Sequence, residues 1–318
     1  MERRLKVIAS GQGGVFSREQ AEAAGYSPEQ LRERLADGRW QRVRRGQYAE
    51  AVELGHLPPW EQEIWRHRRA IHAVVNSVRP GSVAVSHQSA LVLHQVALWG
   101  VDLAEVHVTR RDGRRGRRRG GVRQHAGRLA PDDLAQIEGL TVTTVPRGLV
   151  EFACTSSFES AVVTADSVFH RGLVSREEAA RLLDVIECRP GSATARAALA
   201  FGNRRSESVG ESRLRVLMHD HGLPAPTLQH VVNDARGFVA RTDFYFPEHR
   251  TVVEFDGLTR YGSLETLVQE KVREDRLRAL GLQVVRFIWA DLTHPPAVIT
   301  RLHQAFARAA IGRPYPPF

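Results

Sequence analysis

The stretch RTDFYFPEHRTVVEFDG, residues 241–257, constrains the fold of this chain more than any other. Two runs of aromatic and β-branched residues flank Glu248 and His249, which predicts two antiparallel strands joined by a tight turn. If the turn centres on these two residues, Asp243 faces Glu254 across the hairpin. Directly opposed side chains are roughly 4.5–5.5 Å apart at Cβ, so two carboxylates there repel unless something neutralises them.

Acidic residues are depleted in strands, so the carboxylates of this hairpin need an explanation. A divalent cation with oxygen ligands is one way to neutralise Asp243 and Glu254. A register shifted by one residue would place them on opposite faces, and a solvated face would screen both charges. In either interpretation, Arg241 opposite Asp256 is expected to form an ordinary cross-strand ion pair.

The segments around the hairpin predict a small mixed sheet flanked by helices, in the order αβββαβα. Besides the two hairpin strands, the predicted elements are a helix in SVGESRLRVLMHDHG, a strand in LQHVVNDARG, a helix in LETLVQEKVREDRLRALG, a strand in LQVVRFIWADL and a helix in PPAVITRLHQAFARAA.

This C-terminal segment, residues 204–312, resembles the PD-(D/E)xK nuclease core, in the very-short-patch-repair-like branch known as DUF559. The resemblance rests on GESRLRVL, RTDFYFPEHR, VVEFDG and VREDRLRALGLQVVRFIWADL. It implies a restriction-endonuclease-like fold in which Asp243 and Glu254 bind Mg²⁺ or Mn²⁺. It also implies that Glu211 is an accessory ligand or orients water. The ion would activate water for attack on a phosphodiester.

One position departs from the parent motif. Asp256 stands where that motif has lysine, two residues after Glu254. The acidic variant is usual in this branch, but it leaves open which group supports the nucleophile. Lys271 is a candidate because a buried lysine can lose its proton, and a solvated surface lysine is the alternative. Arg273 with Glu274 resembles an arginine–acid pair common at this place in the branch.

The N-terminal residues predict a winged helix. Two capping boxes, Ser17 with Gln20 and Ser27 with Gln30, mark two successive helix starts separated by a short turn. After Gly38, the run WQRVRRGQY alternates around a glycine and predicts a β-wing. The polar groups expected to contact base edges and phosphates are Gln30, Arg34, Arg42, Arg44 and Arg45. The alternative is a winged helix that contacts protein and has a solvated basic face.

The run FSREQAEAAGYSPEQLRERLADGRWQRVRRGQYA resembles the N-terminal winged-helix domain of the AbiEi family, the antitoxins and transcriptional regulators of type IV toxin–antitoxin systems. The resemblance implies that residues 1–55 bind DNA. It also implies a cognate toxin as a partner, and such regulators often pair with a second copy of themselves.

Residues 56–203 predict a mixed α/β connecting region, which resembles that of AbiEi-like proteins. Its glycine-interrupted run RRDGRRGRRRGGVRQ predicts a flexible loop. The loop either grips phosphates non-specifically or is simply solvated. The arginines assigned to DNA are Arg114, Arg115, Arg117, Arg118 and Arg119. The spacing of the histidines in this region shows no metal-binding motif, so we expect them to be structural.

The net charge of +9 favours a polyanionic partner, although lysine is so rare beside arginine that a codon bias explains part of it. No apolar run approaches the roughly 20 residues of a membrane span, and MERRLKVIASGQGG lacks the core of a signal peptide. Cys154 and Cys188 are too few for a disulfide scaffold or a four-ligand zinc site. We therefore expect a cytoplasmic protein without a membrane partner.

These patterns together predict a multidomain chain of the α+β or α/β class. The leading hypothesis is a DNA-binding protein with a Mg²⁺-dependent endonuclease domain. The alternative is a non-catalytic transcriptional regulator or antitoxin that uses the nuclease-like fold only as a binding platform. Action on RNA ranks last because no stacking motif for single strands is visible.

Overall fold

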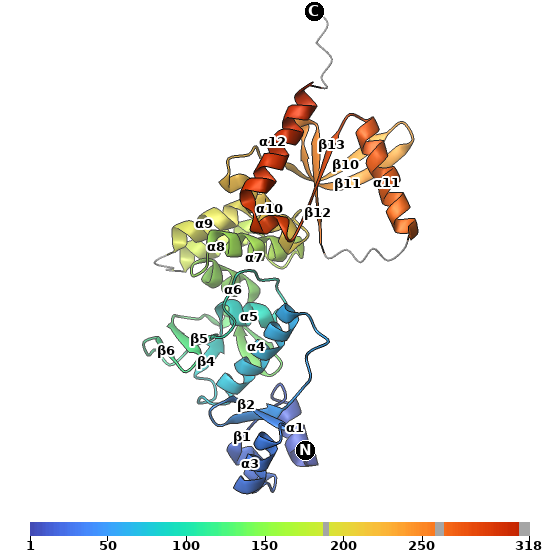
Figure 1. Ribbon diagram of the computed structural model, residues 1–318. Coiled ribbons are helices and arrows are strands. Elements are labelled where there is room, and N and C mark those ends of the chain that lie inside the picture. The colour runs from blue at the N-terminus through green and yellow to red at the C-terminus, as the bar shows by residue number, and fades with distance from the viewer. Residues whose placement is uncertain (187–190, 258–263, 312–318) are drawn as a thin grey trace, which may run out of the picture. The chain divides into compact units, whose positions relative to one another are not determined.

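The computed structural model describes residues 1–186, 191–257 and 264–311, so that Cys188 lies outside the described residues (Figure 1). The chain forms two compact units. Unit 1 comprises Met1–Thr164 with Leu173–Ala200, and unit 2 comprises Ala165–Gly172 with Phe201–Phe318. The described residues form a mixed α/β structure with sheets of three, six and four strands. Among them, no helix is both long enough and apolar enough to cross a membrane.

Unit 1 begins with a small α/β region. Its elements are α1 (Arg3–Ser10), β1 (Val15–Ser17), α2 (Arg18–Ala23), α3 (Pro28–Ala36), β2 (Trp40–Arg44) and β3 (Gln47–Glu50). The strands form an antiparallel sheet in the order β1-β3-β2. Phe16, Trp40 and Tyr26 form its core, with the ring centroids of Phe16 and Trp40 4.7 Å apart. α1 and β1 were not predicted from the sequence.

Both predicted capping boxes are confirmed. The Ser17 hydroxyl accepts the backbone N–H of Gln20 at 3.1 Å, and the Ser27 hydroxyl accepts that of Gln30 at 3.2 Å. Each glutamine side chain reaches back to the backbone N–H of its serine, so two otherwise unpaired donors are satisfied at each helix start. The predicted wing is the hairpin of β2 and β3, which turns at Gly46 with a φ of 76°.

The rest of unit 1 surrounds a six-stranded sheet in the order β6-β7-β5-β4-β9-β8. Its strands are β4 (Val83–Val85), β5 (Val106–Arg110), β6 (Arg117–Arg119), β7 (Val122–Ala126), β8 (Leu134–Ile137) and β9 (Leu140–Thr143). Its helices are α4 (Pro59–Val75), α5 (His87–Leu93), α6 (Val145–Ala153), α8 (Arg176–Val185) and α9 (Ser192–Phe201). Apolar residues of α4 and α5 pack with those of the central strands into one core.

The arginine-rich run is not the loop that the sequence predicted. Arg117–Arg119 forms β6, which pairs antiparallel with β7. The turn between them is Gly120–Gly121, with φ values of 58° and 72°. Two consecutive left-handed residues match the twist of a two-residue hairpin, and only glycine adopts them freely. The arginine side chains of β6 are exposed, so pairing of the backbone orders a segment that has no apolar residue.

Unit 2 has the element order αβββαβα. The elements are α10 (Val209–Asp220), β10 (Thr227–Asp234), β11 (Gly237–Phe246), β12 (Thr251–Asp256), α11 (Leu264–Ala279), β13 (Gln283–Ile288) and α12 (Pro295–Ile311), preceded by the end of α7 (Phe158–His170). The sheet order is β10-β11-β12-β13, antiparallel except for the parallel pair of β12 with β13.

Helices cover both faces of this sheet (Figure 1). Successive residues of a strand point to opposite faces, and Val253 packs with α10 and α12 whereas Val252 packs with Leu277 of α11. The hairpin register is as predicted, with Phe244 opposite Val253 and Phe246 opposite Thr251. This register brings the acidic residues of β11 and β12 to one end of the sheet.

Candidate functional site

The acidic residues of unit 2 lie where the antiparallel pairing of β11 with β12 ends. The pairing of the two strands ends at Phe244 and Val253, one residue before the two acids. The carboxylate of Asp243 accepts the backbone N–H of Phe255 at 2.8 Å. Glu211, in the first turn of α10, accepts the backbone N–H of Glu207 at 3.0 Å and the Gln229 amide at 3.1 Å. Asp243 and Glu211 are therefore held by neutral donors of the protein.

Burial makes these carboxylates unusually basic. Burial and the nearby Glu211 carboxylate raise the pKa of Asp243 to about 6. Burial likewise raises the pKa of Glu211 and that of Glu254, although Arg273 and Arg286 oppose the shift at Glu254. A raised carboxyl pKa in a recessed position is a common sign of a functional site, and it also accompanies structural networks.

Arginines neutralise Glu254. Arg273 of α11 donates from Nη1 and Nη2 to the two carboxylate oxygens at 2.9 and 3.0 Å. Arg286 of β13 lies 3.3 Å from the same carboxylate, 2.9 Å from Glu270 and 3.7 Å from Asp256. The buried charge of Glu254, 5% exposed, is thus paired within the chain.

The predicted cross-strand pair of Arg241 with Asp256 is wrong. Arg241 instead forms two hydrogen bonds with Glu207, at 2.8 and 2.9 Å, and Asp256 lies beside Arg286. The reason is that strand pairing stops before these positions, so Arg241 reaches the residues that precede α10. Lys271 is exposed, and the α11 residue that contacts Glu254 is Arg273.

The arrangement of the acids does not fit a divalent ion as it stands. Within the described part of the chain, the oxygens of Asp243, Glu254 and Glu211 do not come within 4.8 Å of one another as a set. Both oxygens of Glu254 accept hydrogen bonds from Arg273. Mg²⁺ needs several oxygen ligands in near-octahedral geometry, and the guanidinium of Arg273 already neutralises Glu254, so no catalytic step through such an ion follows from these positions.

In the small α/β region that holds α1 to β3, some of the polar residues expected to contact DNA are held by neighbouring groups, and others are exposed. The amide oxygen of Gln30 is held by its capping box, and Arg34 stacks on Tyr26 and Trp40, with its guanidinium 5.1 and 5.3 Å from their ring centroids. Arg44 is half-buried, and burial lowers its pKa. Arg42 and Arg45 are exposed on the wing, where a phosphate backbone could reach them.

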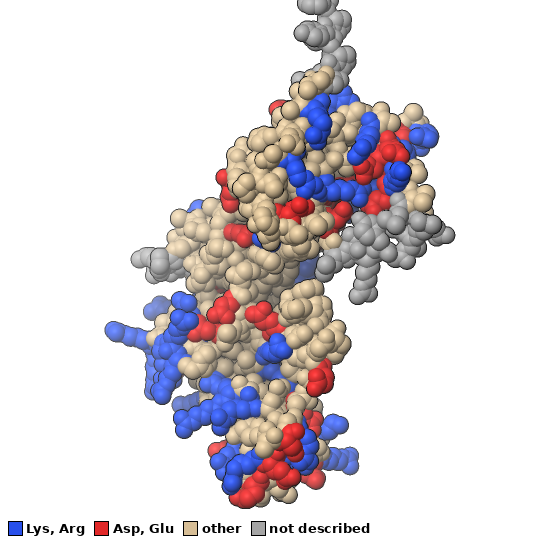
Figure 2. Space-filling model, viewed as in Figure 1, with Lys and Arg blue, Asp and Glu red and all other residues tan. Residues whose placement is uncertain are grey.

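A second basic surface lies on the β6–β7 hairpin, where Figure 2 shows Lys and Arg side chains gathered over the part of unit 1 that holds β6. The five arginines assigned to DNA, Arg114, Arg115, Arg117, Arg118 and Arg119, are all exposed on this hairpin and the preceding turn, as are Arg111 and Arg123. Three of the five have polar partners: Arg118 donates to Glu105 at 2.6 Å, Arg117 donates to Gln124 at 3.1 Å, and the guanidinium of Arg114 lies 3.8 Å from the carboxylate of Asp112.

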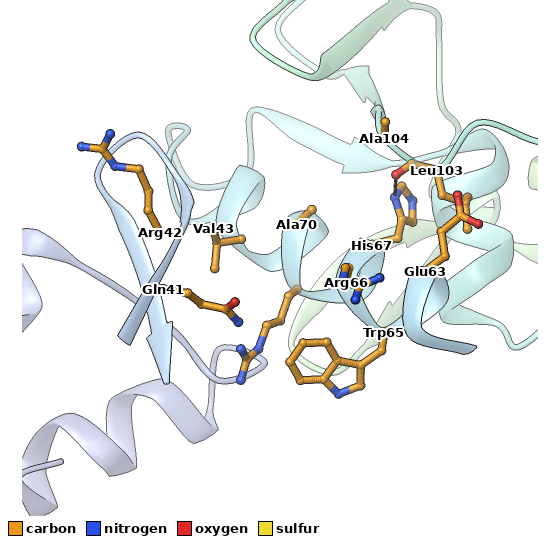
Figure 3. A pocket seen from close by; sticks show the side chains of 11 residues that line it. Gln41, Arg42, Val43, Glu63, Trp65, Arg66, His67, Ala70, Leu103 and Ala104 are labelled. Atoms are coloured by element: carbon orange, nitrogen blue, oxygen red, sulfur yellow. Dashed lines mark hydrogen bonds between the residues drawn. The ribbon is translucent and has the colours of Figure 1, made fainter. Parts of the chain in front are cut away.

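A cleft of about 390 Å³ lies between the wing and α4 (Figure 3). Gln41, Arg42 and Val43 of β2 form one side, and Trp65 and Arg66 of α4 lie on the other. This cleft was not predicted, because it depends on how α4 packs against β2. Arg42 of β2 and both Arg66 and Arg69 of α4 thus line the same cleft.

His67 closes the inner end of the same cleft (Figure 3). Its Nδ1 is 2.6 Å from the carbonyl oxygen of Leu103, and its Nε2 is 2.9 Å from the hydroxyl of Ser89. Burial lowers the pKa of His67 to about 4, so its ring is neutral at pH 7. His67 is therefore a structural hydrogen-bonding group, as expected from the sequence.

Comparison with known proteins identifies the first region of unit 1. Residues 3–51 match the family described as transcriptional regulator, AbiEi antitoxin. The chain is also 29% identical, over 163 residues, to two Mycobacterium tuberculosis proteins: uncharacterized protein Rv2248 of strain ATCC 25618 / H37Rv and uncharacterized protein MT2308 of strain CDC 1551 / Oshkosh. The match covers 51% of this chain and only 60% of the length of each relative. The N-terminal segment is thus an AbiEi antitoxin-like transcriptional regulator domain.

Proposed function

We propose that this chain is a DNA-binding transcriptional regulator of the antitoxin type. The observation that carries the proposal is the match of residues 3–51 to the AbiEi regulator family. In this region α2, α3 and the β2–β3 hairpin follow one another in the order expected of a winged helix. A cognate toxin is the protein partner that this family implies, and a second copy of the chain is the alternative.

The wing is the part of this region best placed to contact phosphates. On α3, Arg32 is paired with Glu29 at 2.7 Å, and the oxygen of Gln30 holds the helix cap. Arg42 and Arg45 of the wing are exposed like Arg32, but neither has an ion pair among the described residues. Contacts from arginine to phosphate fix the register of a protein on duplex DNA, whereas base edges are read by groups that enter a groove.

The β6–β7 hairpin adds a sequence-independent contribution. Its exposed arginines would each displace condensed counterions on approaching a phosphate, which makes binding depend steeply on salt. Arg118 is already paired with Glu105, so its contribution is the smallest of the set. The β6–β7 hairpin thus strengthens binding to any DNA duplex, and the N-terminal region with the wing determines which DNA sequence is preferred.

Endonuclease activity in unit 2 is the second candidate. Its element order αβββαβα and the raised pKa of the half-buried Asp243 favour it. The two hydrogen bonds from Arg273 to Glu254 oppose it, since they occupy the carboxylate that the resemblance assigns to Mg²⁺ or Mn²⁺. We therefore assign unit 2 a binding or regulatory role in the leading proposal.

The test is fluorescence anisotropy with the full chain and two labelled duplexes of equal length, one from upstream of its own gene and one scrambled. A regulator should prefer the upstream duplex by roughly 10³-fold or more. The double variant Arg42→Ala with Arg45→Ala should lower the dependence of log K on log salt by about 2, close to 0.9 for each lost phosphate contact. Equal binding of both duplexes would overturn the proposal.

A matched control replaces two exposed arginines of unit 2, Arg236→Ala with Arg278→Ala, which removes the same net charge without touching the wing. This variant should retain the preference for the upstream duplex. The second candidate is tested in parallel by incubating supercoiled plasmid with Mg²⁺ or Mn²⁺. Nicking by the wild type and not by Glu254→Ala would establish the nuclease instead.

A further inference from the structure

Three histidines from three different elements meet inside unit 1. His87 is the first residue of α5, His107 lies on β5 and His125 on β7. One ring nitrogen of each lies within 4.8 Å of the other two, and Nδ1 of His107 is 3.1 Å from Nε2 of His125. Two nitrogens that share a tetrahedral zinc ion at 2.0–2.1 Å are roughly 3.3 Å apart. This pair therefore already has the separation of two ligands of one ion.

His87 is oriented by polar groups on one side of its ring. Its Nδ1 lies 3.0 Å from the hydroxyl of Ser86 and 3.5 Å from a carboxylate oxygen of Glu151. Histidines that bind metals usually turn one ring nitrogen to a carboxylate or another oxygen and the other to the ion. Nε2 is then the nitrogen of His87 left for a ligand. Arg147 holds the other Glu151 oxygen at 2.8 Å.

His107 has an equivalent partner in Gln88. The side-chain amide of Gln88 lies 2.8 Å from Nε2 of His107. A half-turn of this amide presents its oxygen in place of its nitrogen, which fixes the ring proton on Nε2 and frees Nδ1. The freed Nδ1 is the atom that already faces His125. This half-turn thus frees the nitrogen of His107 that faces His125 to bind an ion.

The backbone supports a special role for His87. Its φ is 54°, in the left-handed region that non-glycine residues rarely adopt. Backbone strain of this kind persists where the surrounding structure fixes it, and it concentrates at ligand sites. The ring of His87 stacks nearly parallel on that of His125, with the centroids 3.7 Å apart. Because a ring nitrogen binds a metal in the plane of its ring, one of these two rings must turn before both can bind the same ion.

The charge state of the cluster also suits a metal. Burial, reinforced by neighbouring positive groups, lowers the pKa of His107 to about 3, and burial lowers that of His125 to about 4. Neutral imidazole is the form that binds metals, and no proton would have to leave at pH 7. Arg123 opposes a cation here, since its positive charge lowers the pKa of all three histidines.

We propose that His87, His107 and His125 bind a divalent transition-metal ion, with zinc the foremost candidate. Imidazole ligands suit zinc, copper, iron and nickel, whereas Mg²⁺ and Ca²⁺ prefer oxygen. Three protein nitrogens leave a fourth position for water or a small anion, which is the arrangement of zinc sites that carry out chemistry. The competing account is a buried hydrogen-bonded network that never binds an ion.

The test uses the full chain, stripped with a chelator, dialysed and titrated with Co²⁺ at pH 7.5. A site of three histidines should give one equivalent of visible d–d absorption that Zn²⁺ abolishes, and Zn²⁺ should raise the thermal midpoint. His125→Gln, at a half-buried position, should weaken binding at least 100-fold. His94→Gln is the matched control, since His94 lies at the opposite end of α5 from His87 and contacts the Thr143 carbonyl.

Glu151→Gln supplies a second variant that keeps all three ligands. It should weaken Zn²⁺ binding by 10–100-fold, as is usual when a carboxylate behind a ligating histidine is lost. No stoichiometric Co²⁺ or Zn²⁺ binding by the wild type would overturn the proposal, whatever the variants do. Equal binding by wild type and a folded His125→Gln would overturn it as well.

Discussion

Arg273 donates two parallel hydrogen bonds to Glu254, at 2.9 and 3.0 Å, and so gives the buried carboxylate of β12 a positive partner from α11. Arg273→Ala should therefore lower the free energy of unfolding by about 2–3 kcal/mol, because hydrogen bonds to a buried charge are lost together. Denaturant unfolding followed by circular dichroism measures the change. Arg278→Ala, which breaks an exposed pair with Glu274, should cost less than about 1 kcal/mol.

Arg273→Ala also tests whether Asp243 and Glu254 can bind a divalent cation. Removal of the Arg273 guanidinium leaves Glu254 near Asp243, with Arg286 as its cationic partner among the described residues. We expect Mg²⁺ to raise the thermal midpoint of Arg273→Ala and to leave that of the wild type unchanged. A Mg²⁺-dependent rise in the wild type that Asp243→Asn abolishes would show that the arginine moves aside for an ion, and would favour the nuclease.

Because of the buried carboxyl group of Asp243, the free energy of unfolding should fall as pH rises. Its pKa is about 6 in the folded chain, above the ordinary value of 3.8, so between these values the folded state binds more protons than the unfolded state. Stability is then lost as pH rises from about 4 to 6, by up to about 3 kcal/mol. Asp243→Asn should be more stable than the wild type at pH 8 and equally stable below pH 4.

Urea unfolding of both proteins across this pH range measures the difference. Asparagine retains an oxygen for the Phe255 N–H, so the substitution mainly removes the charge. Asp220→Asn, at an exposed aspartate at the end of α10, is the matched control. A lower stability of Asp243→Asn at pH 8 would contradict the prediction.

Replacing Gly210 with alanine should destabilise the chain, although this substitution normally stabilises a helix. Glycine to alanine inside a helix usually gains about 1 kcal/mol. At Gly210 of α10, however, an added Cβ would lie 1.9 Å from the ring of Phe255 in β12. Gly210→Ala should therefore destabilise the chain by about 1–3 kcal/mol, the usual range for overpacking. Gly55→Ala has open space around it and should change the thermal midpoint little.

The features that the sequence predicted correctly depend on short-range chemistry. A capping box such as that of Ser27 and Gln30 closes hydrogen bonds over three residues, so its residue types suffice. The register of β11 with β12 follows from the turn at Glu248 and His249 and from side-chain alternation. The Gly120–Gly121 pair was an equally local hairpin signal, but the absence of an apolar period around it favoured a loop.

The contacts that were missed depend on how separate elements pack. Arg273 reaches Glu254 only because α11 lies on the face of the sheet that Val252 shares. The histidine cluster joins α5, β5 and β7, and the spacing of its members along the chain matches no motif. His107 and His125 come together because β5 pairs in parallel with β7, and the pairing of these two strands is not a short-range feature of the sequence.

Asp166 and Arg215 form the most deeply buried ion pair of unit 2 among the described residues. Two hydrogen bonds of 2.7 and 2.8 Å join them, and Asp166 also accepts the Ser212 hydroxyl and the backbone N–H of Asn203. Asp166→Ala would leave the guanidinium buried beside the Phe201 carbonyl, which cannot neutralise its charge. We expect a loss of about 3–5 kcal/mol, the usual cost of an uncompensated buried charge.

A double-mutant cycle separates the pair from its surroundings. The single variants of the cycle are Asp166→Leu and Arg215→Met, and the double variant carries both substitutions. We expect the double variant to recover most of the stability that either single variant loses, because an apolar pair needs no desolvation of charge. Denaturant midpoints of the wild type, both single variants and the double variant give the coupling energy. If the double variant is as unstable as the sum of the singles, the hydrogen bonds to Asn203 and Ser212, rather than the ion pair, hold the end of α7 against α10.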